Sequence, residues 1–185
     1  MRSKLSFGFL IASATGLVVS AMLPLLAGAS AAGPAYLAEV SFTAKAQHGH
    51  LAKLSVTTGA TIPRHPDAFI RSNPVVGFAW VDVGTSKAFV ATIHPAIGRD
   101  SRQNPNGWHA HTVTLATGAT APNEFCLASI DSSPNAGIQV HGKTMRVNVR
   151  ARVLPLAASA VDTAVGFTLQ QDSACTSGLA VRIST

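Results

Sequence analysis

Acidic residues are scarce in this chain, which has only 8 Asp and Glu against 14 Lys and Arg. Charged residues of both signs make up 12% of the sequence, too few for a coiled coil or for a helical bundle with a charged solvent face. Apolar residues make up 47%, which excludes an intrinsically disordered protein. The acids are also too dispersed to suggest the paired carboxylates of a glycoside hydrolase.

The sequence motifs of several enzyme classes are missing. The chain contains no Gly-x-Ser-x-Gly nucleophile motif, no Ser-x-x-Lys and no glycine-rich phosphate loop. A catalytic triad built from distant residues leaves no such pattern, so these absences do not exclude every enzyme. They favour a binding or structural role over catalysis.

Only two cysteines are present, Cys126 and Cys175. So few cannot form a disulfide-rich miniprotein, and their wide separation is unlike the Cys-x-x-Cys of redox and metal sites. In an oxidising compartment the simplest prediction is one structural disulfide between them. Closing a loop of about 50 residues would stabilise the fold by roughly 4 kcal/mol from loop entropy alone.

The N-terminus has the three-part layout of a secretory signal peptide. After a short basic start, residues 5–26 carry no charge, and small residues complete the segment up to Ala31. Cleavage there divides the chain into a leader, 1–31, and one domain, 32–185, that is periplasmic or secreted. The alternative is an uncleaved membrane anchor, because the uncharged stretch is long enough to span a bilayer. Pro24 argues against a continuous helix in that stretch.

Apolar and polar residues mostly alternate after the leader, which is the period of a half-buried β-strand. Turn-forming residues separate the alternating runs, as in Asn104-Pro105-Asn106-Gly107. No long window has the period of a helix. The runs predicted as strands are 36–42, 54–56, 75–83, 88–94, 108–115, 125–130, 137–140, 145–153, 164–170 and 179–184.

This number of short strands predicts an all-β domain. We expect an antiparallel β-sandwich of about nine strands, Ig-like or jelly-roll-like, with one disulfide. A true immunoglobulin domain places its tryptophan between the two cysteines, whereas Trp80 and Trp108 both precede Cys126. The sequence therefore favours the sandwich architecture without the immunoglobulin pattern.

Seven histidines accompany the few acids. His109 and His111 alternate along one predicted strand and therefore face the same side. If that strand pairs with the preceding one, which ends at His94, three imidazoles come together and can hold Zn²⁺ or Cu²⁺ with one coordination position open. His48 and His50 form a second same-face pair. In the competing interpretation, His109 and His111 are rim residues hydrogen-bonded to loop carbonyls.

Arginines alternate with apolar residues on the predicted strand 145–153. Arg146, Arg150 and Arg152 would form a basic stripe on an outward sheet face. Such a stripe suits an anionic glycan, another component of the cell envelope or a protein partner, although a plain solvated face produces the same pattern. Nucleic acid is not an expected partner of an exported chain.

Two functions from different classes follow from these patterns. The first is an exported, non-catalytic protein that acts in binding or structural association at the cell surface, in the periplasm or outside the cell. The second is a secreted or periplasmic protein that binds Zn²⁺ or Cu²⁺ through the His-x-His strand, with metal-dependent catalysis as an extension.

Overall fold

The computed structural model describes residues 33–38, 40–47, 51–73, 75–94, 107–154 and 157–184. These residues belong to one compact unit, and the ten strands found among them all pair antiparallel. The predicted leader, 1–31, lies outside the described residues, so its cleavage stays a prediction. Among the described residues, no helix has the length and apolarity needed to cross a membrane.

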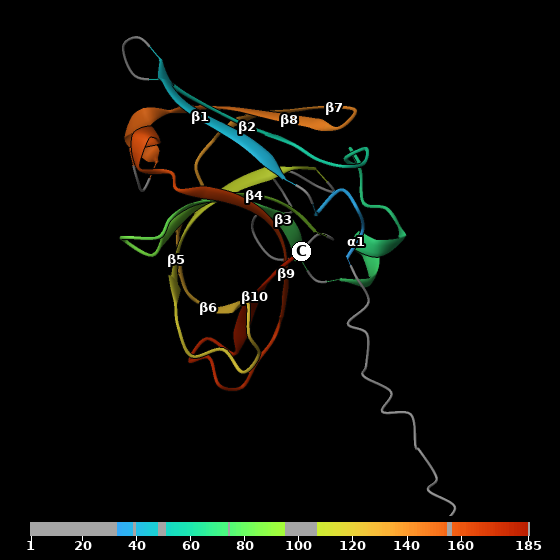
Figure 1. The fold of residues 1–185 in the computed structure, drawn as a ribbon, viewed down its shortest axis with the longest axis vertical. Helices are drawn as coiled ribbons and strands as arrows, with labels where there is room; N and C mark the ends of the chain where they lie inside the picture. The colour runs from blue at the N-terminus through green and yellow to red at the C-terminus, as the bar shows by residue number, and fades with distance from the viewer. Residues whose placement is uncertain are drawn as a thin grey trace, which may run out of the picture. The chain divides into compact units, whose positions relative to one another are not determined.

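The strands form an open sheet and a closed barrel (Figure 1). The sheet has the order β1 (Ser41–Gln47), β2 (Leu51–Thr57), β8 (Thr144–Arg150) and β7 (Gly137–His141). Around the barrel run β10 (Leu179–Ile183), β6 (Glu124–Ser132), β5 (His109–Ala116), β4 (Lys87–Ile93), β3 (Val75–Asp82) and β9 (Thr163–Gln171). The described helices are α1 (Ala68–Ser72) and two 3-10 turns, Ala151–Val153 and Ala158–Ala160.

The prediction of an antiparallel all-β domain with one disulfide is confirmed, but the strands do not form two open facing sheets. The barrel closes because β10 pairs with both β6 and β9. The alternation of apolar and polar residues shows only that one face of a strand is buried. Strands of a barrel and strands of a sandwich have the same two-residue period, so the period does not distinguish the two folds. The choice of partner for each strand therefore could not be inferred from the pattern.

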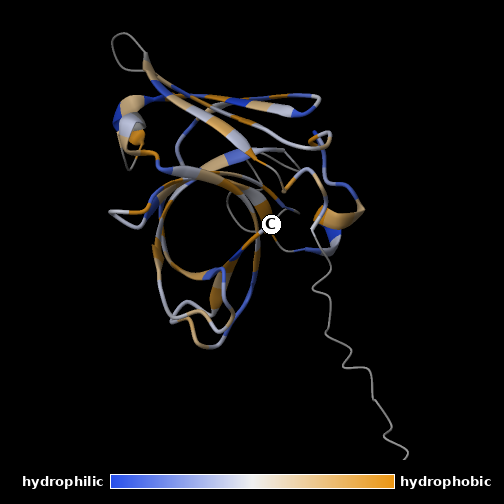
Figure 2. Cartoon of the chain, viewed as in Figure 1, coloured by the Kyte–Doolittle hydropathy of each residue, from blue (hydrophilic) through white to orange (hydrophobic). Residues whose placement is uncertain are grey.

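Two apolar cores lie on opposite sides of the barrel wall. On β3, Phe78 and Trp80 belong to the core between the barrel and the sheet, whereas Ala79 belongs to the core inside the barrel. Leu54 and Met145 supply the sheet's side of the first core. Figure 2 shows hydrophobic residues on the strands of both the barrel and the sheet. Because β3 and β4 are covered on both faces, most of their residues are buried.

The first predicted strand was placed too early in the chain. Tyr36 and Leu37 lie in a turn, in which the Leu37 N–H donates to the Pro34 carbonyl over 2.8 Å, and β1 begins at Ser41. Both turn residues are buried, so their apolar character reflects packing against the barrel. A Cβ atom at Gly166 of β9 would overlap the Leu37 carbonyl, so this close approach requires glycine.

The Cys126–Cys175 disulfide is present, with an S–S distance of 2.06 Å, and it joins β6 to the turn between β9 and β10. Asp172 organises the same turn. Its carboxylate accepts hydrogen bonds from the Thr120 N–H over 2.7 Å, the Thr120 hydroxyl over 2.8 Å and the Ala174 N–H over 2.9 Å. The two backbone hydrogen bonds are the largest cause that lowers the pKa of Asp172 below its ordinary value.

Asp172 should make the stability of the fold depend on acid. Its pKa is lower in the folded state than in the unfolded state, where it is about 3.9. The stabilisation is therefore present above about pH 4 and is lost as the pH falls through the folded-state pKa. We expect Asp172→Asn to lower the melting temperature at pH 7 and to flatten its decline at acid pH, as followed by circular dichroism. A variant with the wild-type profile would contradict this account.

Candidate metal centre

Two neighbouring barrel strands, β4 and β5, position three histidines at one end of the barrel interior. The strands pair so that His109 lies opposite Thr92 and His111 lies opposite Val90. His94 directly follows β4. Because alternate residues of a strand share a face, all three histidines and Thr92 point toward the inside of the barrel.

The three imidazoles are buried and close together. The ring of His109 lies between the other two, with centroid distances of 4.5 Å to His94 and 4.9 Å to His111. One ring nitrogen of each residue lies within 4.8 Å of the corresponding nitrogens of the other two. A tetrahedral ion that is about 2.0–2.1 Å from each ligand needs nitrogens about 3.3 Å apart, so side-chain shifts of about 1 Å complete the site.

The hydrogen bonds of His109 determine its tautomer. Its Nδ1 lies 3.0 Å from the Gly107 carbonyl oxygen. A carbonyl oxygen only accepts, so Nδ1 carries the proton and donates it. In the neutral ring, Nε2 then has the lone pair, and the Thr92 hydroxyl lies 3.4 Å from this atom. An Nδ1–H that donates to a backbone carbonyl is the usual arrangement of a histidine that binds metal through Nε2.

The Nδ1 atom of His111 also has a hydrogen-bond partner. Its Nδ1 lies 2.9 Å from the hydroxyl of Ser133, which directly follows β6. When this hydroxyl accepts the hydrogen bond, Nε2 of His111 is the nitrogen that can bind a metal. A backbone carbonyl and a serine hydroxyl thus orient two of the three rings.

No carboxylate joins this cluster in the part of the chain that the structure describes. The three imidazoles themselves are neutral ligands when each binds through one ring nitrogen. Imidazole suits Zn²⁺, Cu²⁺, Ni²⁺ and Fe²⁺, whereas Mg²⁺ and Ca²⁺ prefer oxygen ligands. The three imidazoles would occupy three of the four positions around a tetrahedral ion.

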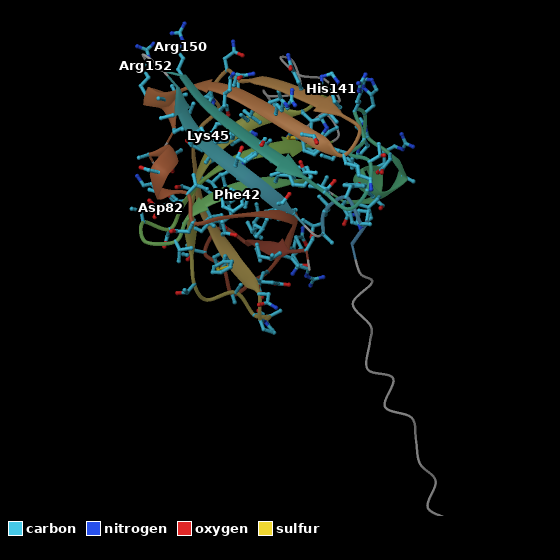
Figure 3. All side chains as sticks on the ribbon, turned by 45° about the horizontal axis from the view of Figure 1, so that its top comes forward. Phe42, Lys45, Asp82, His141, Arg150 and Arg152 are labelled. Atoms are coloured by element: carbon cyan, nitrogen blue, oxygen red, sulfur yellow. A yellow bond between two sulfur atoms is a disulfide. The ribbon has the colours of Figure 1, made fainter. Side chains whose placement is uncertain are left out.

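The other predicted site residues have different outcomes. His48 and His50 lie outside the described residues, so the second histidine pair stays a prediction. Arg146 and Arg150 are exposed on β8. Arg152 lies in the 3-10 turn after the strand, because β8 ends at Arg150 and the prediction extended it too far. Figure 3 shows the Arg150 and Arg152 side chains projecting outward at the same end of the sheet.

Sequence reasoning missed three parts of this region. Thr92 shares the inward parity of His94, and that signal was available in the sequence. Ser133 reaches His111 only because β6 pairs with β5, which no local pattern reveals. The third part is an apolar cavity of about 370 Å³ inside the barrel, whose lining includes Thr92, His94 and His111.

No protein-family model, curated protein or solved structure matches this chain.

Proposed function

We propose that the protein binds one transition-metal ion, Zn²⁺ or Cu²⁺, through His94, His109 and His111. One observation carries the proposal: three buried imidazoles place a ring nitrogen each within 4.8 Å of one another. Coordination through Nε2 would leave the Nδ1 hydrogen bonds of His109 and His111 in place.

The competing interpretation of rim histidines accounts for one feature of the site. It expects hydrogen bonds to loop carbonyls, and His109 does make such a bond with Gly107. The same bond also orients a metal ligand, so it does not separate the two interpretations. The metal interpretation also accounts for the third ring, because His94, His109 and His111 each place a ring nitrogen within 4.8 Å of the other two.

Metal content tests this proposal. We expect metal-free mature protein, incubated with ZnCl₂ and desalted, to retain about one equivalent of zinc by elemental analysis. The double variant His109→Ala, His111→Ala should retain less than about a tenth of an equivalent, because a single imidazole holds zinc weakly. The matched control is His65→Ala, His141→Ala, which removes two exposed histidines elsewhere and should bind zinc like the wild type.

Two results would contradict the metal proposal. The metal proposal would be wrong if the wild-type protein retained neither zinc nor copper. Equal retention by the two double variants would place the bound ion away from β4 and β5.

We further propose association with an anionic glycan outside the cell, for which the outer face of the four-stranded sheet provides support. Lys45 on β1 lies opposite Lys53 on β2, and Lys53 lies opposite Asn148 on β8, beside the exposed Arg146 and Arg150. The four described strands of this sheet contain no Asp or Glu. Such a face attracts polyanions at low ionic strength.

Heparin, a sulfated glycan, is a suitable probe of this face. We expect Arg146→Glu with Arg150→Glu to elute from immobilised heparin at lower salt than the wild type and to bind roughly tenfold more weakly, because two attractions become repulsions. The control Arg71→Glu with Lys87→Glu makes the same change of charge at exposed positions outside the sheet. Equal shifts in the elution salt of both variants would show that net charge alone determines heparin binding. That result would contradict a specific role for the outer face of the sheet.

A further inference from the structure

The cavity inside the barrel is lined mostly by hydrocarbon. It measures about 370 Å³, and all six barrel strands contribute to its wall. The described wall is aliphatic except for Phe167, Thr92, His94 and His111. A molecule inside the barrel would therefore contact aliphatic side chains on nearly every side.

The size of the cavity follows from small side chains at inward positions. Ala79 on β3 and Ala88 on β4 belong to the lining, and valine is its commonest residue. Larger inward residues would have filled this space and stabilised the barrel. The volume lies in the range of sites for small molecules.

Part of the apolar wall is not covered by other protein atoms. Six aliphatic residues that pack against the core inside the barrel are only half-buried, and all six line the cavity: Val81, Leu115, Val165, Leu169, Leu179 and Ile183. A hydrocarbon ligand would remove this surface from water, which is favourable in proportion to the area buried.

The cavity reaches the surface beside β6. Ile130 on this strand lines the cavity and is also 58% exposed. It pairs with Val113 of β5 at a place where the register between the two strands is irregular, which interrupts the regular ladder of the wall. This opening provides a route by which a ligand can enter.

The dimensions of the cavity indicate the form of the ligand. The lining extends along β3 from Val75 to Val81, which is about 20 Å of strand. With the strand tilt usual in barrels, this corresponds to about 15 Å along the barrel axis. An apolar cavity of about 150 Å³ binds benzene, so this one has room for about 15 non-hydrogen atoms. A volume of this size spread over that length suits an extended alkyl chain better than a compact ring system.

We propose that the barrel binds the alkyl chain of a small lipid-like molecule inside this cavity. Binding of the chain does not require a metal ion, because the aliphatic wall makes the contacts. The protein is on this account a carrier or receptor for such molecules, whether or not the histidine cluster holds a metal.

Isothermal titration calorimetry with hexan-1-ol, octan-1-ol and decan-1-ol tests whether the chain is buried. The protein is kept in EDTA, so that bound metal does not contribute. The affinity should rise about fourfold with each added methylene group, or about 15-fold from each alcohol to the next. No binding of decan-1-ol, or an affinity that does not rise with chain length, would overturn the proposal.

Two cavity-filling variants test the location of the chain. Ala79→Leu and Ala88→Leu should each lose at least about tenfold in decan-1-ol affinity, because the added side chain occupies the cavity. Two positions are used so that one variant is available if the other folds poorly. The matched control is Ala116→Leu at an exposed position of β5, which should bind decan-1-ol like the wild type. Unchanged affinity in both cavity variants would overturn the cavity as the binding place.

The alkyl ligand and the metal centre can fail separately. Zinc retention without binding of decan-1-ol would overturn the alkyl ligand and leave the metal proposal in place. Binding of decan-1-ol by a protein that retains no metal would support the alkyl ligand and overturn the metal proposal alone.

Discussion

Zn²⁺ added to the metal-free protein at about 100 times its Kd is expected to stabilise the folded state by about 2.7 kcal/mol. The physical reason is that only the folded barrel brings His94, His109 and His111 within 4.8 Å of one another, so the ion binds the native state preferentially. In a domain of this size, the melting temperature should rise by about 5–10 °C. Differential scanning calorimetry measures this shift.

Two controls make the thermal shift specific. The double variant His109→Ala, His111→Ala should show no rise with Zn²⁺. Mg²⁺ should leave the wild type unchanged, because it prefers oxygen ligands and octahedral geometry. An equal rise in melting temperature with Mg²⁺, or a full rise with Zn²⁺ in the double variant, would show that the ions act outside the histidine cluster.

Phe78→Ala is expected to lower the free energy of unfolding by about 3–5 kcal/mol, the cost of removing a fully buried phenylalanine from a well-packed core. Phe78 is completely buried between the barrel and the four-stranded sheet. Its ring stacks on Trp108, with centroids 5.7 Å apart and planes 22° apart. Urea unfolding followed by circular dichroism measures the loss.

The same variant should also weaken zinc binding. Trp108 immediately precedes His109, and its indole N–H donates to the Pro63 carbonyl over 2.8 Å, so Phe78 and Pro63 together hold the start of β5. The control is Phe125→Ala, which removes a phenylalanine that is 40% exposed and should cost less. Equal losses of stability in the two variants would contradict the placement of Phe78 in the core between sheet and barrel.

Local pattern was sufficient to predict much of the site. Alternation alone indicates that His109 and His111 share a face, and the structure has both on the inner face of β5. Predicting that His94 lies close to these two histidines needed one further assumption, namely that consecutive strands pair. β4 and β5 do pair. Both steps depend on neighbours in sequence, which is why they could be made without knowledge of the fold.

The remaining features depend on contacts between distant segments. The barrel closes through β10, and Ser133 reaches His111 from β6, so neither is visible in a window of sequence. The cavity depends on how inward residues from all six barrel strands fill a common volume. Tyr36 and Leu37 show the converse error, because buried residues in a turn imitate the alternation of a strand.

X-ray absorption spectroscopy of the zinc-loaded protein identifies the atoms that surround the ion. We expect three imidazole nitrogens at about 2.0–2.1 Å from zinc and a fourth light-atom ligand that is not from histidine. Replacing His109 by alanine should reduce or abolish this imidazole scattering. A shell of oxygen ligands alone, or a spectrum that is unchanged in His109→Ala, would contradict a metal centre at His94, His109 and His111.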